Sequence, residues 1–211
     1  MLRPHNLRSY RRRSIRACCY DYSQPGTYFV TICADGMKCL FGSIENGQMH
    51  LSSVGKIVQE CWQEIPKHFH SIELDASVVM QNHFHGIILI PGRGTACRAP
   101  TRAEFGKPVA SSLPTIIRSF KSATTKRIRE TAGNHGLVVW QRNYFEHIVR
   151  DDDAMERIRQ YIVGNPWNWD TDSENQRHKG EDKFDAWLRS FRMPPRKGTA
   201  CRVLTKAEGK G

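Results

Sequence analysis

Apolar and polar positions alternate along several parts of this chain in the pattern typical of β-strands. The runs rich in β-branched and aromatic residues, which favour pleated structure, cover residues 26–33, 72–80 and 83–90, with a further extended stretch over 137–140 and 145–149. Only Gln81 and Asn82 separate the second run from the third, so these two are expected to form a hairpin. Shorter runs at 39–44 and 48–51 flank Asn46-Gly47 and predict a second, small hairpin.

Two segments carry apolar residues at helical spacing. The first follows the capping pair Ser52-Ser53, and its apolar positions are Val54, Ile57, Val58, Cys61, Trp62 and Ile65. The second opens at Ser111-Ser112, has Pro114 in its first turn and extends toward Arg129. Its inward face carries Leu113, Ile116, Ile117 and Phe120.

A third helix is predicted after Asp151-Asp152-Asp153, whose negative charges suit the positive end of a helix dipole. The order is then strand, helix, strand, strand, helix, strand, with this last helix appended. That is the ferredoxin-like (RRM-like) pattern, in which an antiparallel sheet carries helices on one face. We therefore expect an α+β fold.

Two nearly identical segments lie outside this pattern, at residues 94–107 and 198–210, and both begin Gly-Thr-Ala-Cys-Arg. They are too polar and too rich in glycine to pack a core. We expect a flexible insertion at 93–108 and a flexible C-terminal tail at 191–211, which leaves 1–190 as one catalytic domain. Repetitive DNA captured within the gene could account for the copies.

The formal charge of +11 favours a polyanionic partner, with nucleic acid first and an anionic membrane second. The longest purely apolar run, Ile87 to Ile90, is far shorter than the roughly 20 residues of a spanning helix. Met1 to Tyr20 contains six arginines and no apolar signal core, so a cytoplasmic location is expected. The seven cysteines form no CxxC pair and are interpreted as reduced thiols.

Candidate chemistry begins with His83-Phe84-His85. On a strand, residues two apart emerge on the same face roughly 7 Å apart, so both imidazoles could bind one cation while Phe84 points the other way. The triplet alone fits a pair of surface or core histidines as well.

The third predicted helix turns Ala154, Ile158 and Ile162 inward, and this phase places Tyr161 and Asn165 on the inward side as i, i+4 neighbours. A buried amide needs hydrogen-bond partners, which favours a polar site there. Pro166 is expected to end the helix by excluding Asn165 from the α region. Taken alone, the pair fits a core tyrosine above a helix-terminal asparagine better.

Five stretches, in their order and spacing, resemble the REP-associated tyrosine transposases of the HUH superfamily of single-strand nucleases. They span most of residues 12–170, and they are Arg12 to Arg16 (RRSIR), Asp21 to Cys33 (DYSQPGTYFVTIC), Met80 to Gly86 (MQNHFHG), Trp140 to Arg150 (WQRNYFEHIVR) and Tyr161 to Pro166 (YIVGNP). The joint pattern is far more specific than any one motif.

The resemblance implies a single-stranded DNA endonuclease and strand transferase that cuts at or near DNA hairpins. It implies that Tyr161 is the nucleophile, which becomes linked to the 5′ phosphate of the cut strand. It further implies that His83 and His85 bind a divalent metal and that Asn165 is the third ligand. Two imidazoles and an amide oxygen suit Mg²⁺ or Mn²⁺.

Tyr144 is the rival nucleophile, but its extended setting lacks a ligand partner at helical spacing. DNA contacts are expected from a basic arm and from a later helix flank, through Arg11, Arg12, Arg13, Arg118, Lys121, Lys126, Arg129 and Arg142. The arm fits a solvated terminus equally well. Trp167 and Trp169 could stack unpaired bases or be buried against the sheet.

Two other functions remain open on the sequence: a DNA-binding module of the same fold without cleavage, and a hydrolase of another phosphodiester. The sequence does not decide between a monomer and a homodimer.

Overall fold

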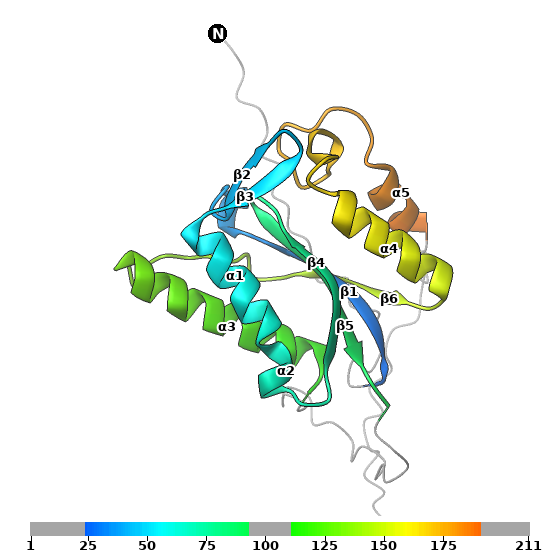
Figure 1. The fold of residues 1–211 in the computed structure, drawn as a ribbon, viewed down its shortest axis with the longest axis horizontal. Coiled ribbons are helices and arrows are strands. Elements are labelled where there is room, and N and C mark those ends of the chain that lie inside the picture. The colour runs from blue at the N-terminus through cyan, green and yellow to red at the C-terminus, as the bar shows by residue number, and fades with distance from the viewer. Residues whose placement is uncertain (1–23, 93–110, 191–211) are drawn as a thin grey trace, which may run out of the picture.

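The computed structural model describes residues 24–92 and 111–190, which build a four-stranded antiparallel sheet with helices on both faces (Figure 1). The N-terminal arm with Arg11, Arg12 and Arg13, the insertion and the C-terminal tail lie outside the described residues. Among the described residues, no helix is both long and apolar enough to span a membrane.

The sheet has the strand order β4-β5-β1-β6, and every neighbouring pair is antiparallel. Its strands are β1 (Gly26–Cys33), β4 (Glu73–Val79), β5 (His83–Ile90) and β6 (Phe145–Val149). This is the order of a ferredoxin-like sheet, so the predicted α+β fold class is confirmed. A separate hairpin, β2 (Gly42–Glu45) and β3 (Gln48–Leu51), turns at Asn46 and Gly47, which both have positive φ.

Five helices accompany the sheet. They are α1 (Ser53–Gln63), α2 (Ile65–His68), α3 (Leu113–Ala132), α4 (Asp152–Gly164) and α5 (Lys183–Ser190), and short 3₁₀ turns cover Asp35–Met37 and Trp169–Thr171. The side chain of Ser52 caps α1 by accepting from the Gly55 N–H, and Asp151 caps α4 by accepting from the Ala154 N–H.

Alternation along β1 and β5 divides the core between the two faces of the sheet. Tyr28, Val30 and Ile32 pack with α1 and α3 on one face. Phe29 and Ile87 pack on the other face, with the buried residues of α4 and α5, which are Ile158, Ile162, Phe184 and Leu188. The predicted inward stripe of α4 is therefore confirmed, and it lies on the face opposite α1 and α3 (Figure 1).

Three expectations need correction. Residues 137–140 form no strand, and only an isolated bridge joins Trp140 to Ala34. Asn165 keeps helical angles (φ −60°, ψ −42°), so Pro166 does not end α4 by excluding it from the α region. The chain turns only after Asn165. Finally, α2 and α5 have no counterpart among the predicted elements, because each is too short for a clear period.

Candidate metal and nucleophile site

His83 and His85 lie on the α4 side of β5, and both are buried. Their Nε2 atoms face each other at 2.9 Å. The prediction that both imidazoles lie on one face of the strand is confirmed. Their Nε2 atoms are much closer together than the spacing of the two residues along the strand. Two buried nitrogens in such contact need either a shared proton or a cation between them.

Asn82, directly before the pair, determines which ring nitrogen of His83 carries the proton. Its Nδ2 donates to the backbone carbonyl of Glu174 at 2.9 Å, and because a carbonyl only accepts, the Asn82 Oδ1 must face His83. The Nδ1 of His83 lies 2.9 Å from that oxygen and therefore carries the proton. Consequently the His83 Nε2 presents a lone pair, which is the form that binds metal.

Thr31 supports the second imidazole in the same manner. Its hydroxyl oxygen lies 2.9 Å from the Nδ1 of His85 and can accept a hydrogen bond from the N–H at that position. The two outer nitrogens are thus both engaged, and both Nε2 atoms are aimed at one point. This arrangement of second partners is typical of metal-binding histidines.

Asp172 is the third member of this cluster, and the sequence analysis did not identify it. One donor atom each from His83, His85 and Asp172 lies within 4.8 Å of the others, and all three residues are buried. The Asp172 Oδ2 is 3.8 Å from the His83 Nε2, while its Oδ1 accepts from the Glu174 N–H at 2.6 Å. Because Asp172 follows a 3₁₀ turn in an irregular segment, no periodicity marked it, and the stretches that carry the resemblance stop at Pro166.

Tyr161 reaches this cluster from α4. Its hydroxyl lies 3.4 Å from the Asp172 Oδ2 and 3.5 Å from the His85 Nε2. The ring of Phe184 in α5 stacks on the tyrosine ring, with centroids 3.6 Å apart and planes 9° apart. Burial, followed by the charges of Asp172, Asp182 and Glu174, raises the pKa of Tyr161 well above its ordinary value.

Asn165 is buried beside Asp172, which agrees with its predicted position on the inward side of the helix. Its Nδ2 donates to the Asp172 Oδ2 at 2.7 Å, whereas its Oδ1 is buried without a hydrogen-bond partner among the described residues. An orphaned amide oxygen at this place is what a nearby cation would satisfy. In the observed orientation, Asn165 holds the carboxylate, and its role as a direct ligand stays a prediction.

The donor set fits a divalent cation. Octahedral ligands about 2.1 Å from Mg²⁺ are roughly 3 Å from one another, close to the 2.9 Å between the two Nε2 atoms. The carboxylate of Asp172 adds an anionic oxygen beside them. Imidazole nitrogens favour Mn²⁺ over Mg²⁺, so a preference for Mn²⁺ stays the expectation.

Tyr144 lies away from the cluster. It packs against the core on the α1 and α3 face, and the ammonium of Lys121 lies 5.7 Å from its ring centroid. The structure therefore brings Tyr161, and not Tyr144, to the two histidines. Of the two tryptophans, Trp169 stacks on His83 with centroids 6.0 Å apart, while Trp167 is 75% exposed.

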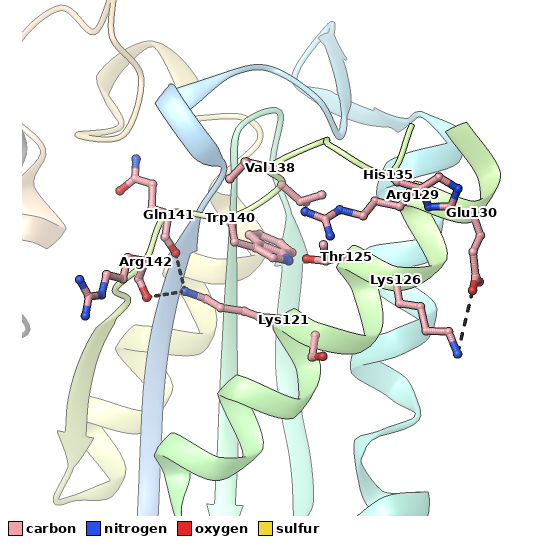
Figure 2. A pocket seen from close by; sticks show the side chains of 12 residues that line it. Lys121, Thr125, Lys126, Arg129, Glu130, His135, Val138, Trp140, Gln141 and Arg142 are labelled. Atoms are coloured by element: carbon pink, nitrogen blue, oxygen red, sulfur yellow. Dashed lines mark hydrogen bonds and ion pairs between the residues drawn. The ribbon is translucent and has the colours of Figure 1, made fainter. Parts of the chain in front are cut away.

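The basic residues expected on α3 differ in their contacts, and three of them, Lys121, Lys126 and Arg129, line one groove (Figure 2). Arg129 and Lys126 line a groove beside the segment that contains Arg142, and Arg118 is exposed on the same helix outside the groove. Lys121 is different, because its ammonium donates to the carbonyls of Gln141 and Asn143 at 2.8 and 2.9 Å. Burial lowers the pKa of Lys121 to about 8.

No protein-family model matches the chain. Among solved structures, it is similar to a REP-associated tyrosine transposase bound to a REP hairpin, with 19% identity, a TM-score of 0.47 and coverage of 70% of each chain. It is also similar to a putative transposase from Deinococcus radiodurans, with 14% identity, a TM-score of 0.40 and coverage of 77% of this chain and 96% of that one.

An uncharacterized protein of Haemophilus influenzae is 38% identical over 177 residues, which covers 82% of this chain and 97% of that protein. With this identity over nearly the whole of the relative, the chain belongs to the same protein family as the Haemophilus influenzae protein.

Proposed function

We propose that this chain is a transposase-like, metal-dependent enzyme that cuts single-stranded DNA at or near hairpins and transfers the cut strand through Tyr161. The observation that carries the proposal is the convergence of the Tyr161 hydroxyl with His85 and Asp172, 3.5 and 3.4 Å away. The ordered resemblance to the HUH tyrosine transposases and the net charge of +11 point to the same chemistry and to DNA as the partner.

In the proposed reaction, the Tyr161 oxygen attacks the scissile phosphorus and forms a phosphotyrosine with the 5′ phosphate of the cut strand. The bond from phosphorus to the 3′ oxygen breaks, and that oxygen leaves as a 3′ hydroxyl after gaining a proton. The phenol proton passes to an acceptor beside it, for which the Asp172 carboxylate is within reach. A 3′ hydroxyl can reverse the step and rejoin the strand without an external energy source.

His83, His85 and Asp172 would hold the divalent cation, with Asn165 beside them. Such a cation polarises the phosphoryl oxygens and offsets negative charge that develops in the transition state. Burial and the nearby carboxylates keep Tyr161 protonated, so this site depends on positive charge close to the phenol before it can act.

Access to Tyr161 sets a condition on the mechanism. The cavity beside the tyrosine has a volume of about 10 Å³ and is lined by Phe184 and Leu188 of α5. A DNA strand is far larger, so α5 has to move away from Tyr161 before the hydroxyl can meet a phosphate.

The proposal is tested by incubating the full chain with end-labelled single-stranded hairpin oligonucleotides in Mg²⁺, Mn²⁺ or EDTA, followed by a denaturing gel. We expect a metal-dependent protein–DNA adduct that disappears in Tyr161→Phe and persists in Tyr144→Phe. Asp172→Asn, which keeps the shape and removes the charge, is expected to lower the adduct yield at limiting metal. Binding to many hairpins without any adduct would instead favour a DNA-binding protein of this fold that does not cleave.

A further inference from the structure

Trp167, just beyond α4, is the only exposed tryptophan, tyrosine or phenylalanine within residues 24–92 and 111–190, and its exposed fraction is 75%. Val163, one helical turn earlier, is 77% exposed. Helical hydrogen bonding continues past the end of α4, because the Asn168 N–H donates to the Gly164 carbonyl at 3.1 Å. Val163 and Trp167 therefore lie side by side on the outer face of this helix end.

The indole of Trp167 packs against the turn of the β2–β3 hairpin, which lies beside the C-terminal end of α4 (Figure 1). A Cβ atom added to Gly47 would come 1.9 Å from the Cε3 of the indole and 2.4 Å from its Cζ3. The ring thus occupies the space that any larger residue would need. Gly47 also has a φ of +73°, which glycine adopts without strain. The turn therefore supports one side of an indole whose remaining surface faces solvent.

The segment that carries Trp167 also contributes to the candidate metal site. Asn165 donates to the Asp172 Oδ2 at 2.7 Å, and the ring of Trp169 stacks on that of His83. Trp167 lies midway between Asn165 and Trp169 in the chain, so its Cα is at most about 7 Å from either of theirs. A DNA strand that reaches the cluster therefore has its neighbouring nucleotides within reach of this indole.

The size of this apolar patch decides between a protein and a single base as its occupant. A tryptophan contributes about 150–250 Å² when it is covered. A stable protein interface needs roughly 800 Å² from each partner. The only other exposed large apolar side chain in the described part of the chain is Val138, which belongs to the segment after α3. The patch is thus too small for a protein partner, whereas one nucleotide base can cover an indole.

We infer that Trp167 stacks on one unpaired base of the strand that is cut, among the nucleotides that flank the phosphate at Tyr161. The inference rests on the proposed function, which brings a single strand to this cluster. Every base has a π-face, so such stacking selects unpaired nucleotides and carries little base sequence. Gly47 is a positioning residue, because it admits the indole at the turn. An indole that is held in advance loses little conformational freedom when a base stacks on it.

The test measures DNA binding by fluorescence anisotropy in Mn²⁺, in a Tyr161→Phe background that forms no adduct. The probes are a labelled hairpin with mixed-sequence single-stranded tails at both ends, the same hairpin without tails, and tailed hairpins that each lack one tail base. Trp167→Leu keeps an apolar side chain and removes the ring, so it is expected to weaken binding of the tailed hairpin about 5-fold or more. Trp167→Phe, which keeps a ring, should retain most of the affinity. Neither change should affect the tailless hairpin.

The probes that lack one base identify the nucleotide on Trp167. Removal of that base should lower the affinity of the chain with Trp167 and cause no further loss in Trp167→Leu, because the stacking partner is already gone. A purely structural role of Trp167 would instead lower the affinity for every probe equally. Equal losses with and without tails, or equal affinities of Trp167 and Trp167→Leu for the tailed hairpin, would overturn the inference.

Gly47→Ala should reproduce the loss that is specific to the tails, because the added methyl group displaces the indole. Gly36→Ala is the matched control, since Gly36 has a similar φ of +61° while its added Cβ would meet only the Lys38 side chain, at 3.7 Å. Equal affinities of the two glycine variants for the tailed hairpin would overturn the role of Gly47. Adduct formation is read separately in the Tyr161 chain, so a failed nuclease and a failed stacking site give different results.

Discussion

At the scale of single residues, the candidate site depends on side chains that never touch a metal. Asn82 determines which nitrogen of His83 is protonated, and Thr31 engages the outer nitrogen of His85. His83 and His85 were predictable because an alternating strand places them on one face. Asn82 was not, since its role needs the Glu174 carbonyl, which lies far away in the chain.

Asn82→Ala is expected to weaken Mn²⁺ binding about 10-fold to 100-fold, because the proton on His83 loses the partner that fixes it. Isothermal titration of the full chain with Mn²⁺ measures this directly. Asn168→Ala is the matched control, since Asn168 is exposed and its side chain donates only to the Gly164 carbonyl. An unchanged Mn²⁺ affinity in Asn82→Ala would contradict the assigned tautomer.

Lys121 gives a prediction about stability and pH. Burial lowers its pKa from 10.5 to about 8, so between these values the unfolded chain holds a proton that the folded protein has released. The free energy of unfolding therefore gains a contribution that rises with pH over this interval. We expect urea unfolding of Lys121→Met to lack that rise. Lys126→Met, on the same helix but exposed, should retain it, and parallel pH profiles for wild type and Lys121→Met would contradict the account.

At the scale of elements, the strongly periodic segments were predictable, and the irregular ones were not. Strand β1 has the bounds that its β-branched run predicted, and α4 begins within a residue of its acidic cap. Asp172 lies beyond α4, where tight turns leave no apolar period, and α5 has only eight residues, too few for its apolar pair Phe184 and Leu188 to stand out. Periodicity along β5 and α4 therefore predicted the positions of the two histidines and of Tyr161. The position of Asp172 depends on how the loop after α4 folds back.

A bidentate ion pair sets the position of α4 on the sheet. Arg159 donates to both carboxylate oxygens of Asp75 in β4, at 2.9 and 2.7 Å, and its guanidinium holds the pKa of Asp75 below the ordinary value. Tyr161 lies two residues further along this helix. We therefore expect the pair to position Tyr161, the proposed nucleophile.

Arg159→Ala is expected to slow adduct formation several-fold without changing the Mn²⁺ affinity, because the helix shifts while the histidines stay in place. Arg159→Lys should recover only part of the rate, since an ammonium cannot donate in the same bidentate way. Gln160→Ala, an exposed change on the same helix, serves as the control. Loss of Mn²⁺ affinity together with rate would show that the pair supports the whole site instead.

At the scale of the whole molecule, α4 and α5 cover one face of the sheet, and α1 and α3 cover the other (Figure 1). Tyr161 packs on the first face, whereas Lys126 and Arg129 belong to α3. All the residues proposed for the nucleophile and the metal belong to one chain, so a single protomer carries a complete set. The net charge of +11 indicated nucleic acid but could not place it, because the position of a charge on either face depends on the packing of α3.

The central claim is that Tyr161 becomes covalently linked to DNA, and tryptic mass spectrometry of the adduct tests it most directly. Cleavage after arginine places Tyr161 as the only tyrosine in peptide 160–177 and Tyr144 as the only tyrosine in peptide 143–150. After nuclease trimming of the DNA, we expect the remaining nucleotide mass on peptide 160–177, bonded to Tyr161. Nucleotide mass on peptide 143–150, or an adduct on neither peptide, would contradict the assignment of the nucleophile.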